Sequence, residues 1–174
     1  MSKYSKEVEK SMQFLARNKE VIFLGQSVIY PGNLIYKSLT QVKDSKKIEL
    51  PVFEEVQLGM SIGMAMNGMF PITCFPRFDF LLCAMNQLVN HADKIKLITN
   101  NQYSPQMIIR VLVGAKKPLD GGEQHTQNYV NEIKKMLKTI VVWDLKDQKK
   151  IFPSYKKAFK NKKINLMVEY SQSY

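Results

Sequence analysis

Two adjacent carboxylates, Glu54 and Glu55, are the residues of this sequence best placed for acid–base chemistry. They follow the short run 50–53 and open the segment EEVQLGMSIGMAMNG, whose small and apolar residues are typical of a buried helix. Burying an ionised carboxylate is costly unless a partner pairs with it or it holds a proton. The position therefore suits a functional carboxyl group, although acidic residues in a first helical turn also simply stabilise the positive end of a helix.

Two glycines in that segment, Gly59 and Gly63, are four residues apart and lie on one face of the predicted helix. Because glycine has no side chain, another backbone can approach that face closely. The other residues of the segment are almost all apolar, among them Met60, Ile62 and Met64. We therefore expect this helix to be buried nearly all round.

A histidine in a glycine-rich loop is the second candidate for chemistry. His125 is one of two histidines and follows the turn 120–122, within a loop over 114–127 from which a side chain can reach a cleft. Taken by itself, an isolated loop histidine is most often a plain surface residue. The other histidine, His91, falls within a helical pattern and is interpreted as structural.

Alternating strand and helix patterns must position these residues. Short apolar runs predict strands over 21–24, 48–50, 70–75, 107–113, 139–143 and 165–169. Helical spacing of apolar residues predicts helices over 4–18, 34–42, 54–68, 78–98, 128–137 and 147–160. Strands separated by helices predict an α/β fold, a three-layer, doubly wound and mostly parallel sheet with helices on both faces.

The carboxyl ends of such strands are where ligands bind in open α/β sheets. Gln26, Glu54, the aromatic segment 75–80 and the loop 114–125 each follow a predicted strand. We therefore expect these four segments to share one rim of the sheet.

Composition bounds the class of protein. With 174 residues, 45% of them hydrophobic, the chain is expected to form one domain over 1–174. It contains no apolar run long enough to cross a bilayer, and its polar start MSKYSKEVEK does not resemble a signal peptide. Cys74 and Cys83 stand in apolar contexts without metal-ligand spacing, which predicts two buried free thiols and a cytoplasmic protein.

The formal net charge of +11 comes almost entirely from lysine and is densest over 134–163. A basic face of this kind could bind nucleic acid through phosphate contacts or dock an acidic partner. The pattern instead favours solvated lysines on helix faces. The aromatic residues of the region occupy predicted core positions and do not form a stacking platform: Trp143, Phe152, Tyr155 and Phe159.

Four segments, in order along the chain, carry a resemblance to a known family. They are FLGQSV at 23–28, PVFEEVQLGMSIGMAMNGMFPI from Pro51, FPRFDFLLCAMNQLVNHADK from Phe75, and EQHTQ around His125. Over 21–170 the chain resembles the pyrimidine-binding domain of the thiamine-diphosphate-dependent, transketolase-like superfamily. It is most similar to the beta subunit of 2-oxoacid dehydrogenase decarboxylases.

The resemblance implies roles for several side chains. Gly59 and Gly63 match the two helix glycines of the family only if Glu54 is the key glutamate of the family. In the family, that glutamate hydrogen-bonds the aminopyrimidine ring of thiamine diphosphate and so helps the cofactor lose a proton from its thiazolium carbon. His125 would contact the substrate as a proton donor or anion partner. Phe80 would stack on the aminopyrimidine ring.

Neighbouring aromatic residues leave the stacking position open by register. Phe78 or Phe75 could take the role of Phe80, although both also fit the core. For these two residues the core interpretation is preferred.

Two departures from the family pattern bear on the activity. Gln26 and Ser27 stand where the dehydrogenase relatives carry an acidic pair, so Gln26 would contribute a neutral hydrogen bond to the cofactor site. The chain also shows neither the C-terminal transketolase domain nor the pyrophosphate-binding domain. We therefore expect a separate alpha-type subunit to hold the diphosphate and Mg²⁺, in an α2β2 assembly, with no metal ligands in this chain.

The function implied is that of the pyrimidine-domain subunit of a split enzyme that decarboxylates a 2-oxo acid or transfers a ketol unit from a ketose. The altered pair at Gln26 and Ser27 also allows a catalytically inactive scaffold or regulatory subunit of the same fold. A basic nucleic-acid-binding module is the third alternative.

Overall fold

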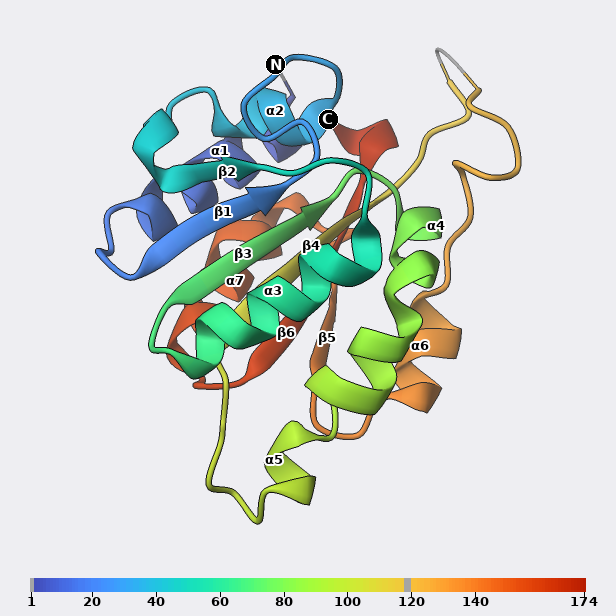
Figure 1. The fold of residues 1–174 in the computed structure, drawn as a ribbon. Coiled ribbons are helices and arrows are strands. Elements are labelled where there is room, and N and C mark those ends of the chain that lie inside the picture. Colours follow the sequence, from blue (N-terminus) through green and yellow to red (C-terminus); the bar gives the residue numbers. More distant parts are fainter. Residues whose placement is uncertain (1, 118–119) are drawn as a thin grey trace.

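The computed structural model describes residues 2–117 and 120–174, and Figure 1 shows the fold. Residues 118–119, inside the glycine-rich loop predicted over 114–127, lie outside the described residues.

Six strands form one sheet in the order β2-β1-β3-β4-β6-β5, and every neighbouring pair is parallel. The central strands are buried along their whole length, because helices cover both faces of the sheet. The predicted parallel α/β fold is confirmed. The strands are β1 Val21–Gly25, β2 Lys47–Glu49, β3 Phe70–Phe75, β4 Met107–Val113, β5 Val141–Asp144 and β6 Ile164–Tyr170.

The helices form a layer on each face of the sheet (Figure 1). One core cluster joins the sheet to α1 (Lys3–Ala16), α2 (Leu34–Leu39) and α7 (Ile151–Lys160). The other cluster joins it to α3 (Glu54–Met66), α4 (Phe78–Leu81) and α6 (Val130–Met136). Successive residues of β4 alternate between the two clusters, with Ile108 in the first and Ile109 in the second. The predicted three layers are therefore present.

The predicted continuous helix over 78–98 is wrong beyond α4, which ends at Leu81. After α4 the chain passes through a 3₁₀ turn, Leu82–Ala84, and a π-helix, Asn86–Ala92, before the separate α5, Ile95–Ile98. The break falls at Asp93, whose buried carboxylate accepts hydrogen bonds from the backbone N–H groups of 138–140 just before β5. This tertiary anchor overrides the helical spacing.

Within the described part of the chain, no helix combines the length and apolar character needed to span a membrane.

The expectation that α3 is buried nearly all round is also wrong. Val56, Met60 and Met66 are 47%, 41% and 40% exposed. Gly63 has no atom within 4 Å of a Cβ built on it, and Gly59 faces only the side chain of Gln87, at 3.6 Å. Within the described chain, no other backbone therefore packs against the two glycines. The helix α3 presents an apolar outer face to solvent.

The prediction that the aromatic residues of the basic last third lie in the core is confirmed for Tyr155, whereas Trp143, Phe152 and Phe159 are half-buried. Tyr155 is fully buried, and Phe159 makes edge-to-face contacts with Phe14 and Phe70. Trp143 donates its indole N–H to Asn165, at 2.9 Å. These rings are therefore occupied within the fold and are not presented for stacking on bases.

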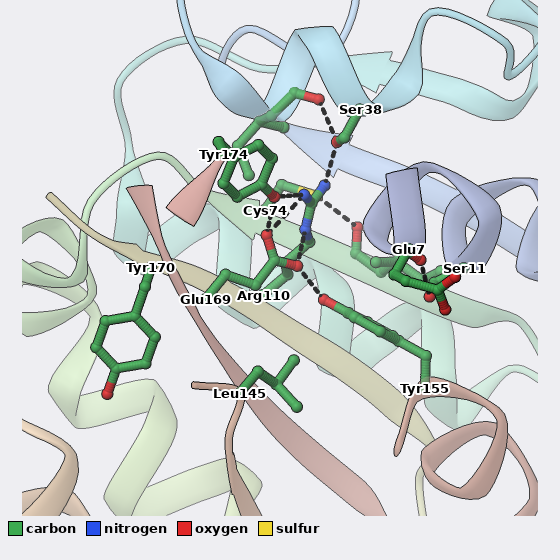
Figure 2. Close-up of polar contacts among 12 residues, drawn as sticks. Glu7, Ser11, Ser38, Cys74, Arg110, Leu145, Tyr155, Glu169, Tyr170 and Tyr174 are labelled. Atoms are coloured by element: carbon green, nitrogen blue, oxygen red, sulfur yellow. Dashed lines mark hydrogen bonds and ion pairs between the residues drawn. The ribbon is translucent and has the colours of Figure 1, made fainter. Parts of the chain in front are cut away.

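A buried ion pair lies at the centre of the sheet (Figure 2). The guanidinium of Arg110, on β4, donates two hydrogen bonds to the carboxylate of Glu169, on β6, at 2.7 and 2.9 Å. It also donates to Ser38 Oγ and Tyr174 Oη, both at 2.8 Å. The hydroxyls of Tyr155 and Tyr174 donate to the Glu169 carboxylate. Every charged atom of the pair is thus satisfied without water.

Burial and the neighbouring Glu169 carboxylate raise the pKa of the Tyr155 and Tyr174 hydroxyls well above the ordinary tyrosine value. Burial alone would lower the pKa of Arg110, but the same carboxylate raises it above its ordinary value. Tyr155, Tyr174 and Arg110 therefore remain protonated donors at physiological pH.

The two cysteines lie in different environments, and the prediction that both are buried is wrong for Cys83. Cys74 is buried on β3, whereas Cys83, in the 3₁₀ turn after α4, is exposed. Burial, together with the nearby Glu169 carboxylate, raises the pKa of the Cys74 thiol to about 11, although Arg110 acts in the opposite direction.

Replacing Arg110 with Met should destabilise the fold by about 3–5 kcal/mol, because it leaves the Glu169 carboxylate buried without its counter-charge. Urea denaturation of the single variant gives this number. The double variant R110M/E169L should recover part of the loss, since no lone charge remains buried. A single variant within about 1 kcal/mol of wild type would contradict the role given to the ion pair.

The thiol environments predict a simple titration. At neutral pH one thiol, that of the exposed Cys83, should react rapidly with an aromatic disulfide reagent. The thiolate is the reacting form, and the pKa of the buried Cys74 thiol is raised to about 11, so Cys74 should not react. Cys74 should react only after denaturant is added. Rapid modification of C83S at neutral pH would show that Cys74 is accessible after all.

Candidate functional site

The predicted site residues all lie beyond the carboxyl edge of the sheet. Gln26 directly follows β1, and Glu54 is the first residue of α3, which follows β2. Phe80 lies in α4 after β3, and His125 lies between β4 and α6. Because the strands are parallel, these four connections meet at the same edge (Figure 1).

The amide of Gln26 donates a hydrogen bond from Nε2 to Glu54 Oε1, at 3.1 Å. Both side chains are half-buried. Within the described residues, the second carboxylate oxygen of Glu54 makes no hydrogen bond. One oxygen is therefore held from inside the chain, and the other has no hydrogen-bond partner among the described residues.

Glu55 points elsewhere. It is exposed and accepts hydrogen bonds from the side chains of Asn86, at 2.9 Å, and Gln87, at 3.5 Å. The two adjacent carboxylates therefore differ in surroundings, which provides a matched pair for experiment.

Gln57, one turn beyond Glu54, fixes the start of α3 against the sheet. Its amide donates to Thr73 Oγ1, at 2.8 Å, and to the carbonyl of Cys74, at 3.1 Å. Gly25, with φ +141°, is required beside it, since a Cβ there would lie 2.3 Å from the same Cys74 carbonyl oxygen. The end of β1 and the start of α3 are thus packed tightly together.

A residue that the sequence reasoning missed holds the turn after Gln26. The carboxylate of Glu49, the last residue of β2, accepts hydrogen bonds from the backbone N–H groups of Ser27, Val28 and Ile29 at 2.5, 2.8 and 2.8 Å. Ser27 has a left-handed backbone, with φ 54°. An acidic residue inside the predicted strand 48–50 was the only available signal, and it does not show which amides the carboxylate meets.

Phe80 and His125 lie against each other, with ring centroids 5.4 Å apart and an interplanar angle of 84°. Both are half-buried. Phe78 and Phe75 are fully buried, and Phe78 packs edge-to-face on Tyr129. Of the three phenylalanines considered for stacking, only Phe80 therefore keeps an accessible surface.

Two glycines let the loop that carries His125 fold back onto the end of β4. A Cβ on Gly114 would lie 1.8 Å from the His125 carbonyl oxygen and 3.3 Å from Arg77 Cδ. A Cβ on Gly121 would lie 2.8 Å from His125 Cβ. Side chains at these positions would displace His125, so the glycines fix its place.

The site thus consists of two pairs, Gln26 with Glu54 and Phe80 with His125. Within residues 2–117 and 120–174, no hydrogen bond or ring contact joins one pair to the other. Asp79, next to Phe80, contributes a buried carboxylate oxygen, Oδ2, that has no partner among these residues.

His91 lies in the π-helix Asn86–Ala92 and is exposed, away from these pairs. Among the residues whose placement is described, no three His, Cys, Asp or Glu side chains gather as a metal site would require.

The family described as "Transketolase, pyrimidine binding domain" matches this chain over residues 3–174. The chain belongs to this family. The resemblance noted from the sequence motifs is confirmed.

Curated relatives are beta subunits of 2-oxoacid dehydrogenases. The chain is 30% identical to "2-oxoisovalerate dehydrogenase subunit beta" of Bacillus subtilis over 118 residues, which is 66% of this chain and 35% of the relative. It is 30% identical to "Pyruvate dehydrogenase E1 component subunit beta" of Rickettsia bellii, again over 66% of this chain, and 36% of the relative. The matches span about a third of the length of these relatives.

A solved structure with the same fold is described as "Split gene transketolase, inactive beta4 tetramer". Its TM-score is 0.69 at 14% identity, and the match covers 97% of this chain and 50% of the other. The likeness confirms the fold of this pyrimidine-binding domain.

Replacing Gly114 with Ala should destabilise the chain by about 1–3 kcal/mol and shift the His125 resonances, because the new Cβ collides with the His125 carbonyl. Thermal unfolding and NMR of the His125 ring check both effects. The matched control is G63A, which introduces the same methyl group where no atom lies within 4 Å. That variant should be as stable as wild type or more stable, since Ala favours a helix. Equal behaviour of the two variants would contradict the close approach at Gly114.

Proposed function

We propose that this chain is the pyrimidine-domain subunit of a split thiamine-diphosphate-dependent enzyme, active together with a partner chain. The observation that carries the proposal is the carboxylate of Glu54, held through one oxygen by Gln26 and free at the other, at the carboxyl edge of the sheet. Family membership supplies the cofactor class.

The residues present fit the pyrimidine half of the cofactor. Glu54 would share a hydrogen bond with a ring nitrogen through its free oxygen, and Phe80 would stack its accessible ring on the aminopyrimidine. When bound, thiamine diphosphate supplies the electron sink for breaking a bond next to a carbonyl carbon.

His125 would act on the substrate. The His125 side chain is half-buried, and its ring packs nearly perpendicular to the ring of Phe80. The position of His125 is therefore tied to that of Phe80, the ring proposed to stack on the cofactor. A histidine there can donate a proton or pair with a carboxylate group of the substrate.

The proposal includes a partner that covers the α3 side of the site. Apolar residues around Glu54 are exposed, with Val52 at 73%, Phe53 at 61% and Val56 at 47%. Exposed apolar surface beside a site is typical of a protein interface. The partner would be an alpha-type subunit carrying the pyrophosphate-binding domain, with the diphosphate and Mg²⁺, in an α2β2 heterotetramer.

The substrate proposed is a 2-oxo acid. The curated relatives are named for 2-oxoisovalerate and pyruvate, which favours a 2-oxo acid over a ketose.

Free thiols at Cys74 and Cys83 favour a reducing compartment, so we place the enzyme in the cytoplasm.

A catalytically inactive subunit of the same fold is the second candidate. Gln26 favours it, because an amide stands where the related dehydrogenases carry an acidic residue that could take part in proton transfer. In this case the assembled complex would lack cofactor-dependent turnover with every substrate.

Replacing Glu54 with Gln should lower kcat of the assembled complex by at least about 100-fold, since the amide cannot share a proton with the cofactor ring. The complex would be purified from the native host with its co-purifying alpha-type chain and assayed for thiamine-diphosphate-dependent decarboxylation of 2-oxo acids. The matched control is E55Q, which alters the neighbouring exposed carboxylate and should leave kcat within about twofold of wild type. Near-normal turnover by E54Q would remove the catalytic role of Glu54. A wild-type complex that binds no cofactor would favour the inactive-subunit alternative.

A further inference from the structure

We infer that Glu49 is a positioning residue for the catalytic carboxylate, acting on Glu54 through the turn that carries Gln26. The inference rests on the proposed function of Glu54. It assigns a purpose to the half-buried carboxylate of Glu49, which has no part in the core and makes no ion pair within the described residues.

The turn after β1 depends on this carboxylate. Three successive backbone N–H groups, those of Ser27, Val28 and Ile29, converge on Glu49 at 2.5 to 2.8 Å. Such convergence of amides forms a small anion-binding nest, here filled by a side chain of the same molecule. Ser27 adopts a left-handed conformation that its Cβ disfavours, so local preferences alone would not hold the turn.

The nest is rigidly joined to both sides of the site. Gly25 and Glu49 are register partners in the β1–β2 pair, and the backbone N–H of Leu50 donates to the Gly25 carbonyl, at 2.9 Å. Gln26 lies between this pairing and the nest, so the backbone on each side of it is held. Its amide is thereby directed at Glu54 Oε1, 3.1 Å away.

An amide cannot replace the carboxylate of Glu49. A carboxylate offers two acceptor oxygens to the three N–H groups, whereas Gln offers one oxygen and turns an NH₂ group toward a backbone donor. E49Q should therefore release the turn and free the Gln26 amide. The free oxygen of Glu54 would remain present but less well directed, which lowers kcat more than it raises KM for the 2-oxo acid.

The first test uses the free chain and needs no activity. In ¹H–¹⁵N spectra, E49Q should shift the backbone amides of 27–29 and also the side-chain NH₂ signals of Gln26. E49D, which keeps the charge on a shorter side chain, should show an intermediate effect. The matched control is D93N, because Asp93 likewise accepts several backbone N–H groups, those of 138–140, before β5. D93N should shift the signals of 138–140 and leave those of Gln26 in place. Unchanged Gln26 signals in well-folded E49Q and E49D would overturn the inference.

The second test uses the assembled complex. E49Q and Q26A should each lower kcat about tenfold, and the double variant E49Q/Q26A should lose little more than the larger single loss, because both changes break one path to Glu54. D93N should leave kcat within about twofold of wild type. Losses that multiply in the double variant would show that Glu49 does not act through Gln26. Normal turnover by E54Q would instead refute the proposed function, while the coupling of Glu49 to Gln26 seen in the free chain would stand.

Discussion

The ion pair between Arg110 and Glu169 is the constraint on which the sheet depends. It lies between the two strands that share the longest pairing, β4 and β6, and it draws Ser38, Tyr155 and Tyr174 onto the same point from α2, α7 and the last turn. A buried charge left without its partner is far more costly than a lost surface contact, so the ion pair favours the arrangement in which all these elements are in place. The carboxyl end of β4, from which the loop carrying His125 departs, is therefore fixed by an arrangement with little tolerance for partial formation.

Much of the fold could be predicted because it depends on properties visible along the chain. Apolar runs separated by segments of helical spacing locate all six strands along the chain. Because the strands are parallel, Gln26, Glu54, Phe80 and His125 lie at one edge of the sheet, whatever the detailed contacts are. The pairings within the site were not predictable. Nothing in the spacing shows that the Gln26 amide meets Glu54 or that Phe80 meets His125, because both contacts depend on where loops turn in space.

The wrong predictions have different physical causes. Helical spacing continues past Asp93, yet its carboxylate ends the helix by binding the amides before β5. The apolar character of α3 predicted burial, but Met60 is 41% exposed, and within the described chain no atom lies within 4 Å of a Cβ built on Gly63. Glu49 was overlooked because its three amide partners lie 20 to 22 residues earlier in the sequence, where no local pattern reveals them.

The exposed face of α3 has a consequence for how such a protein is made in the cell. Val56, Met60 and Met66 form an apolar surface that water solvates poorly, and Phe53 extends it toward Glu54. For a subunit whose site is completed by a second chain, as proposed, copies synthesised in excess have nothing to cover this surface and are prone to self-association and to proteolysis. The abundance of the subunit would then be set by the supply of its partner, and matched synthesis of the two chains would be a requirement of the architecture.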